Sequence, residues 1–289
     1  GNFHKLLPSG SVNYRNKKIN AFGSSWYFNN MFDHKATMDM NMIINNQSSS
    51  FFNQFHRINH PIGSGARLGL DYFVNDKITV GYLANLYQGN MYGWEPSSVR
   101  VKGPAQNNYD FLDAIQDFNY YWYGHSHNIN VKNQISNDEF FNIDADFARR
   151  TNGNETSNNN QFYINNNPLN KSYILQKGNA ISYIFSIKAD YEKKLLKEIT
   201  LSLGAKASYV VTDNDFKSFN GTTNLDMVQN FNASNVFKYK EAIFAAYGTV
   251  VKTWKELWTM DLGLRLEQTN AHGISATTDS DFYKSYLNF

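Results

Sequence analysis

Two histidines at alternate positions are the first residues of this chain whose types and spacing could do chemistry. His125 and His127 flank one serine, so on a β-strand both imidazoles would lie on one face, where two histidines can chelate a divalent ion. No carboxylate or third histidine falls nearby in the pattern, and Tyr121, Trp122 and Tyr123 lie just before the pair. The sequence therefore favours an aromatic belt at this position and predicts no metal site.

Paired carboxylates are the second candidates. On one strand face, Asp144 and Asp146 would lie roughly 6 to 7 Å apart, a separation that glycoside hydrolysis could use. Nothing in the neighbouring sequence predicts a shifted pKa for either acid, so a charged wall is the favoured interpretation. Two further acidic pairs have the spacing of calcium loops without the complete ligand set and are expected to be solvated loop acids: Asp213 with Asp215, and Asp279 with Asp281.

Other catalytic signatures are missing from the sequence. It has no cysteine, which excludes thiolate catalysis, thiolate zinc sites and disulfides. It also has no nucleophile-elbow phrase and no glycine-rich phosphate loop. A net charge of +2 with scattered basic residues argues against nucleic-acid binding. We therefore predict no catalytic residue, no cofactor and no enzyme activity.

Composition indicates which elements must position these side chains. Aromatic residues make up 16% of the chain and charged residues 18%, with 22 Phe and 19 Tyr, and the mean hydropathy is −0.54. A disordered chain would lack Phe and Tyr, and a soluble domain carries about a quarter charged residues. No window approaches the roughly 18 uninterrupted apolar residues of a membrane helix, so strands must carry the apolar residues.

Apolar and polar residues alternate with a period of two in several segments, which is the pattern of strands with two different faces. Residues 181–191, 199–211 and 258–267 follow it almost without error. Strands of about 10 to 15 residues are long enough to cross a bilayer at a tilt. Six charged side chains on the polar faces are expected to face a watery lumen: Lys188, Asp190, Lys206, Asp261, Arg265 and Glu267.

Short and long connections alternate along the chain, as in outer-membrane barrels, which have tight periplasmic turns and long external loops. Short turns are predicted at residues 15–18, 75–77, 134–138, 193–197 and 253–256. Long polar loops are predicted at residues 89–116, 151–177, 212–235 and 270–281. Three prolines are expected to avoid strand interiors: Pro96, Pro104 and Pro168. Near the start, residues 18–44 are predicted to form one long arm, with residues 51–73 as its antiparallel partner.

These patterns predict an all-β fold, an antiparallel up-and-down transmembrane β-barrel. About eleven strands can be read, and because single-chain bacterial barrels normally close with an even number, we expect part of a larger barrel of about 22 strands. Residues 1–289 would form one barrel segment without a plug, signal peptide or soluble domain. Aromatic residues near strand ends would form girdles at the membrane interfaces, with these candidates: Trp26, Trp94, Trp122, Tyr123, Trp254 and Trp258.

Four phrases carry a family resemblance: residues 10–23 (GSVNYRNKKINAFG), 70–79 (LDYFVNDKIT), 209–219 (YVVTDNDFKSF) and 265–273 (RLEQTNAHG). In this order they resemble the outer-membrane β-barrel family of Bacteroidetes, relatives of TonB-dependent receptors. The resemblance implies an outer-membrane location in contact with lipid, and a plug and a carboxypeptidase-like β-sandwich ahead of the barrel in the whole protein. A TonB-type energy-coupling protein or other envelope subunits would then be partners.

We therefore expect an outer-membrane wall, either of a solute-uptake protein similar to TonB-dependent receptors or of a larger envelope complex. The main alternative is a soluble, secreted β-sandwich or adhesin that binds glycans through loops rich in Asn and aromatic residues. A third possibility, an outer-membrane enzyme, would need a catalytic group at the barrel mouth or in the lumen, and none stands out in the sequence.

Overall fold

The strands all belong to one antiparallel sheet. The structure, a computed structural model, describes residues 3–44, 47–102, 110–196, 198–255, 257–277 and 279–289. Its sheet has 14 strands, and eleven of them follow one another in the order β1-β3-β5-β6-β7-β8-β9-β10-β12-β13-β14. Of the others, β2 pairs with β3, β4 with β5 and β11 with β10. The prediction of an all-β, up-and-down fold is confirmed.

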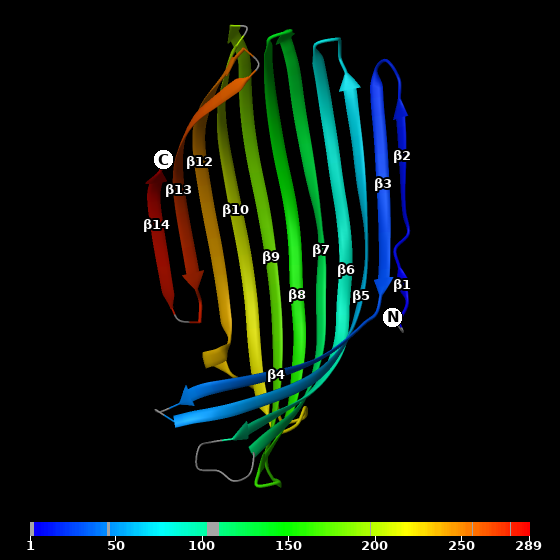
Figure 1. Cartoon of the computed structure of the whole chain (residues 1–289), viewed down its shortest axis with the longest axis vertical. Helices are drawn as coiled ribbons and strands as arrows, with labels where there is room; N and C mark the ends of the chain where they lie inside the picture. The colour runs from blue at the N-terminus through cyan, green and yellow to red at the C-terminus, as the bar shows by residue number, and fades with distance from the viewer. Residues whose placement is uncertain (1–2, 45–46, 103–109, 197, 256, 278) are drawn as a thin grey trace.

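The strands are longest in the middle of the sheet (Figure 1). The first half comprises β1 (Lys5–Leu6), β2 (Ser9–Arg15), β3 (Ile19–Asn30), β4 (Phe32–Ile44), β5 (Gln47–Phe73), β6 (Ile78–Lys102) and β7 (Asp110–Ser136). The second half comprises β8 (Glu139–Ile164), β9 (Asn167–Leu196), β10 (Ile199–Gly221), β11 (Val228–Gln229), the 3-10 turn η1 (Phe231–Ala233), β12 (Asn235–Trp254), β13 (Trp258–Ser275) and β14 (Ser280–Asn288). In the described ranges, no helix is long and apolar enough to span a membrane.

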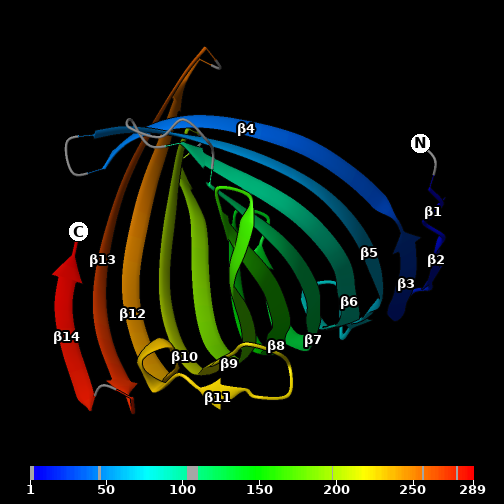
Figure 2. The same cartoon turned by 90° about the horizontal axis from the view of Figure 1, so that it is seen from below.

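The sheet is curved and open. In Figure 2 the strands near the N-terminus and those near the C-terminus lie at opposite edges of the sheet. Among the described residues, no pairing joins β14 to β1, β2 or β3. The chain therefore forms a curved wall and not, by itself, a closed barrel.

Short connections lie at or directly beside all five predicted turns, at the upper end of the sheet in Figure 1. Residues 134–136, 193–196 and 253–254 of the predicted turns belong to strands, and residues 197 and 256 lie outside the described residues. Asparagine side chains form two of them. Asn16 Oδ1 accepts hydrogen bonds from the backbone N–H groups of Lys18 and Ile19, both at 2.8 Å. Asn75 Oδ1 does the same for Lys77 and Ile78, at 2.8 and 2.9 Å. These bonds fix tight turns locally, because the side chain takes the place of a backbone acceptor.

The four predicted long loops are largely wrong, because most of their residues lie in strands. β6 continues to Lys102, β8 to Ile164 and β10 to Gly221. The segment between β8 and β9 is reduced to Asn165 and Asn166, both with positive φ. The prediction assumed that a polar segment has an irregular backbone. In the structure, the ladder of backbone hydrogen bonds between strands continues even where both faces of the sheet carry polar side chains.

The prediction that the three prolines avoid strand interiors is wrong for Pro96. Pro96 lies inside β6 and Pro168 is the second residue of β9, while Pro104 lies outside the described residues. The pairing of β6 with β5 lapses between the Phe55–Ser97 and Ile58–Trp94 pairs, beside the proline that cannot donate an N–H. One strand interior thus tolerates a proline at the cost of a local gap in the ladder.

The long early arm is interrupted at Met31, which separates β3 from β4. Both strands pair with β5, as predicted for the descending partner. β4 leaves the direction of β3 and crosses the lower part of the sheet together with β5 (Figure 1). At the break, the Met31 N–H donates to His4 O at 3.2 Å. The backbone N–H at the change of direction therefore still has a hydrogen-bond partner.

The register divides the side chains into an apolar face and a polar face, because paired residues point to the same side of a sheet. Large apolar side chains of the apolar face are widely exposed, with Phe185 and Leu203 at 47%, Phe244 at 53% and Leu264 at 67%. In the described part of the chain, only four hydrophobic residues are buried: Ala84, Phe118, Ala245 and Ala271. A soluble sandwich has two sheets packed around a core, so the alternative of a soluble β-sandwich does not fit this single layer.

Candidate functional site

The six charged residues predicted to face a lumen lie on one face of the sheet. Lys206 pairs with Lys188 on β9 and with Ala245 on β12, and Ala245 pairs with Glu267 on β13. Asp190 is two residues from Lys188, and Arg265 and Asp261 are two and six residues from Glu267. Even spacing along a strand keeps a side chain on the same face, so all six share the polar face.

Four of these residues form one polar cluster with Tyr247. Lys188 Nζ lies 2.7 Å from Asp190 Oδ2, and the Tyr247 hydroxyl donates to Asp190 Oδ1 at 2.6 Å. The Arg265 guanidinium lies 5.6 Å from the Tyr247 ring centroid and 2.6 Å from Glu267 Oε2. Charges of opposite sign two residues apart on the same strand therefore neutralise one another on this face.

The two other predicted residues are less engaged. Lys206 lies directly opposite Lys188, and Asp261 lies opposite Val251 near the short-turn end of β13. Within the described ranges, neither Lys206 nor Asp261 takes part in an ion pair. Tyr247 lies at the centre of the cluster and was not predicted. Its spacing was the signal that could have found it, because Tyr247 is two residues from Ala245 and from Thr249 and so shares their strand face.

The carboxylates of Asp144 and Asp146 extend the same face onto β8. Asp144 pairs in register with Lys188 and accepts a hydrogen bond from Asn142 Nδ2. Asp146 accepts from Asn128 Nδ2 at 2.8 Å and from the Ser186 hydroxyl at 3.0 Å. Both acids are thus tied into a lattice of amide and hydroxyl donors, which is the arrangement of a charged wall.

A shallow cavity of about 410 Å³ lies on this polar face near the short turns. Lys132, Asn142, Asp190, Glu192 and Tyr247 contribute polar atoms to its lining. This surface therefore offers both positively and negatively charged side chains to water or to a polar solute.

The aromatic candidates for membrane girdles are distributed over both faces. Trp254 and Trp258 pair directly across the β12–β13 turn and lie on the apolar face, with Lys252 Nζ 4.8 Å from the Trp254 ring centroid. Tyr123 also lies on the apolar face and is 42% exposed. Trp122 is its neighbour in a strand and therefore lies on the polar face, so the assignment of Trp122 to a girdle is corrected.

Trp122 belongs instead to an aromatic row on the polar face. Its ring lies 6.5 Å from that of Phe28, which lies 5.7 Å from that of Trp26. Each ring covers a glycine: a Cβ at Gly89 would lie 2.4 Å from Trp122, and one at Gly65 would lie 2.4 Å from Trp26. Trp26 is therefore corrected in the same way. Pairing an aromatic ring with a glycine across strands shields the bare backbone.

His125 and His127 lie on the apolar face, beside Phe147 and Tyr82. His127 Nε2 lies 3.1 Å from His125 Nδ1, and the Tyr82 hydroxyl lies 2.7 Å from His127 Nδ1. The Phe147 ring is 5.6 Å from that of His125. The described residues hold no group of three or more potential metal ligands.

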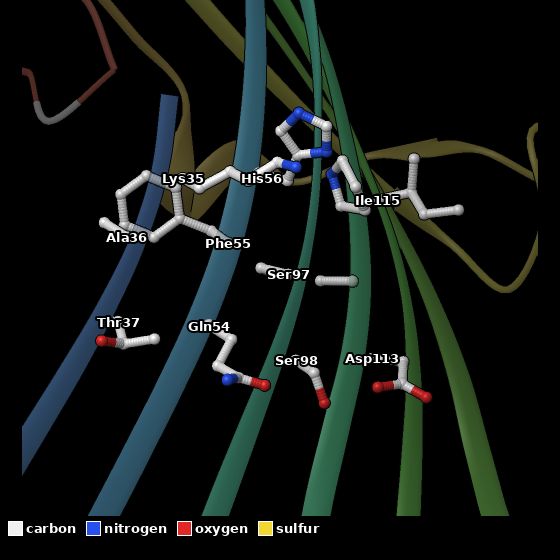
Figure 3. A pocket seen from close by; sticks show the side chains of 12 residues that line it. Lys35, Ala36, Thr37, Gln54, Phe55, His56, Ser97, Ser98, Asp113 and Ile115 are labelled. Atoms are coloured by element: carbon white, nitrogen blue, oxygen red, sulfur yellow. The ribbon is translucent and has the colours of Figure 1, made fainter. Parts of the chain in front are cut away.

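A second hollow lies on the apolar side of the sheet, far from the short turns (Figure 3). It has a volume of about 590 Å³ and is formed by β4, β5, β6 and β7. Lys35, His56 and Asp113 are among its labelled side chains, and the His56 ring is also 2.6 Å from Asp33 Oδ1. At this end the apolar side of the sheet therefore also carries charged and polar side chains.

The connection after β10 is held by the carboxylate of Asp226. It accepts hydrogen bonds from the backbone N–H groups of Thr222 at 3.1 Å and Thr223 at 2.7 Å, and from the Thr223 hydroxyl at 2.9 Å. Donors to the charged form hold the pKa of Asp226 well below its ordinary value. Its contribution to this connection is therefore full above the ordinary aspartate pKa of about 3.9 and is lost only as the pH falls through the lower folded value.

We predict that Asp226→Ala releases this connection. At neutral pH, hydrogen exchange of residues 222–227 should become faster, while residues 212–218 in β10 keep their protection. In the unmodified protein, protection of residues 222–227 should persist down to about pH 4, because the ordinary aspartate pKa is about 3.9 and the folded value is lower. Unchanged exchange in Asp226→Ala would show that the strands alone hold the connection.

Comparisons with known proteins yield one family match. The model of a family described as "Outer membrane protein beta-barrel family" matches residues 132–289, more than half of the chain. No curated protein matches the chain significantly.

Among solved structures, the outer membrane protease OmpT from Escherichia coli is 9% identical over 94% of this chain and 92% of that chain, with a TM-score of 0.28. The toluene transporter TbuX from Ralstonia pickettii is 10% identical over 92% and 80%, with a TM-score of 0.29. The ferric yersiniabactin uptake receptor FyuA from Yersinia pestis is 8% identical over 98% and 59%, with a TM-score of 0.27. These structural likenesses are too remote to carry an argument.

Proposed function

Because the chain belongs to the outer membrane protein β-barrel family, we propose that it forms part of the wall of a solute-uptake protein related to TonB-dependent receptors. The family places it in the bacterial outer membrane, where the apolar face contacts lipid. The polar face, with its cluster around Tyr247, then lines the lumen. The single observation that carries this proposal is the separation of charged and apolar side chains onto opposite faces of the same strands.

The dimensions of the apolar face support a membrane span. On β8, Phe141, Ile143, Ala145 and Phe147 occupy the apolar face between Glu139 and Arg149. Ten residues rise roughly 33 Å along a strand, and a tilt of about 40° reduces this to about 25 Å, the height of the apolar band of outer-membrane barrels. Trp254 and Trp258 at the short turns, and Tyr123 at the other end, form the proposed girdles.

The open edges of the sheet support a larger barrel. An exposed edge in lipid would leave backbone N–H and C=O groups without partners, which costs several kcal/mol for each group. Additional strands must therefore pair with β14 and with the β1–β3 edge, which fits the expected total of about 22 strands. A plug domain and a TonB-type energy-coupling protein are the proposed partners, and we propose no enzymatic role for this wall.

Single thiols test which face meets water, because the chain itself has no cysteine. Lys206→Cys lies on the polar face and Ala207→Cys on the apolar face of the same strand. In outer membranes that contain the full-length protein, a water-soluble maleimide should label Lys206→Cys much faster than Ala207→Cys. Equal rates at the two positions would contradict the proposed faces.

An energy-dependence measurement separates an uptake receptor from a static wall. In a receptor whose plug moves only when energy is supplied, labelling of Lys206→Cys in living cells should slow when an uncoupler collapses the inner-membrane proton gradient. Labelling of a thiol at Asn224, in the connection beyond β10, serves as the control and should not change. Uncoupler-independent labelling of Lys206→Cys would refute the receptor-like role and leave the structural wall.

A further inference from the structure

Arg149 is a cation on the apolar face that has no acidic partner in the described part of the chain. It pairs in register with His125 on β7 and Tyr183 on β9, both of which lie on this face. Its guanidinium is 5.7 Å from the Tyr123 ring centroid and 5.9 Å from that of Tyr183. Of the ion pairs formed by the described residues, none includes Arg149.

The position of Arg149 is the end of the apolar band that lies away from the short turns. Toward the short turns on β8 lie Phe147 and Ala145, and on the other side of Arg149 lies the buried Thr151. An arginine in the middle of the band would strongly destabilise the barrel, whereas near the interface its cost almost vanishes. Because short turns are periplasmic in such barrels, this end meets the outer leaflet, at the depth of the lipid headgroups.

A chain of hydrogen bonds leads to the same place. When the Tyr82 hydroxyl donates to His127 Nδ1, His127 Nε2–H donates to His125 Nδ1. His125 Nε2–H is then left as a donor on the residue that pairs with Arg149. A guanidinium and an imidazole N–H side by side form a set of donors that suits an oxyanion.

A hollow of about 480 Å³ adjoins these donors. Tyr123, His125 and Leu86 line it on one side, and Ser25, Ser64 and Gln88 supply hydroxyl and amide groups from β3, β5 and β6. Register places these side chains on the apolar face. Polar groups at this depth, beside the guanidinium of Arg149, can hydrogen-bond hydroxyl groups of a ligand such as a sugar.

We propose that Arg149, His125 and Tyr123 bind the phosphate of a phosphorylated glycolipid of the outer leaflet, with its sugar over the adjoining hollow. The charge of Arg149 complements the phosphate, and the tyrosine rings hold the guanidinium at the headgroup level. This site rests on the membrane position of the family and does not depend on the uptake proposal.

Native mass spectrometry of the full-length protein in detergent tests the site, with diphosphorylated lipid A as the probe. The unmodified protein should retain this lipid, and Arg149→Gln should bind it at least about tenfold more weakly, because charge-assisted hydrogen bonds contribute about 1.5–3 kcal/mol. Arg149→Lys, which keeps the charge and loses the planar fork, should fall between them. Heat-modifiable migration on gels verifies that each variant is folded.

The matched control is Arg150→Gln, the next arginine on the same strand but on the polar face. It should bind the lipid as the unmodified protein does, and dephosphorylated lipid A should bind the unmodified protein as weakly as diphosphorylated lipid A binds Arg149→Gln. Equal loss in Arg150→Gln, or equal binding of the dephosphorylated lipid, would overturn the proposal. So would displacement of the lipid by millimolar inorganic phosphate, which would indicate a site for a free anion.

Discussion

Leu203→Arg should lower the free energy of unfolding of the full-length barrel in lipid vesicles by roughly 2–4 kcal/mol, the cost of an arginine facing lipid near the bilayer midplane. Leu203 lies on the apolar face of β10, 47% exposed, between Tyr191 on β9 and Gly248 on β12. Among the described residues, the nearest acid on this face is Glu139, whose carboxylate already accepts a hydrogen bond from Tyr191 and forms an ion pair with Lys193, so little of the cost should be offset. Denaturant titration, followed by the gel shift of the folded barrel, measures the change.

The adjacent residue provides the control. Ser202 lies on the polar face, and its hydroxyl donates to Glu192 Oε2 at 3.2 Å. Ser202→Arg introduces the same side chain beside a carboxylate and water, so it should cost far less than Leu203→Arg. Lys206→Leu, also on the polar face, should likewise cost much less. Equal destabilisation at Ser202 and Leu203 would contradict the assignment of the two faces.

The faces could be predicted from sequence because strand periodicity is local. In residues 199–211 the two-residue alternation already separates Leu203 from Lys206, and pairing across strands repeats the separation in space. By the same rule, Trp122 and Tyr123 cannot both belong to one girdle, because they lie on opposite faces of the strand. That error arose because both residues were assigned by type, while adjacent positions in a strand point to opposite sides.

The strand extensions could not be predicted from composition. Asn152 and Asn154 lie in β8 and pair with Ala180 and Gly178 of β9, although Asn and Gly are poor strand formers. Backbone pairing with two neighbours overrides that weak preference. The long β4–β5 extension and Pro96 within β6 show the same effect, because a neighbouring ladder can hold a residue that by itself favours a turn.

The contacts of the polar cluster depend on register, which the sequence does not specify by itself. Asp190 and Tyr247 are 57 residues apart and meet because Gly204, between them on β10, pairs with both. The charged residues were identifiable from their alternation. Their arrangement around a tyrosine follows only once the pairing of β9, β10 and β12 is known.

Gly204 is therefore a position where a small change should have a large effect on the polar face. Glycine in a strand ordinarily costs about 0.5–1 kcal/mol relative to alanine, so Gly→Ala would normally stabilise the sheet. At Gly204, however, an added Cβ would lie 2.3 Å from atoms of the Tyr247 ring. The ring must move, which disturbs the hydrogen bond of its hydroxyl to Asp190 and its contact with Arg265.

We expect Gly204→Ala to lower the free energy of unfolding by about 1–3 kcal/mol, the usual cost of overpacking. Gly248→Ala on the apolar face is the matched control, because its Cβ would lie 3.0 Å from the Leu203 Cδ2 methyl, which can rotate away. In a Tyr247→Ala background the penalty at Gly204 should disappear, which a double-mutant cycle measures as a coupling energy. A penalty that persists without the ring would place the strain in the backbone of β10, and the ring would then shield Gly204 without constraining it.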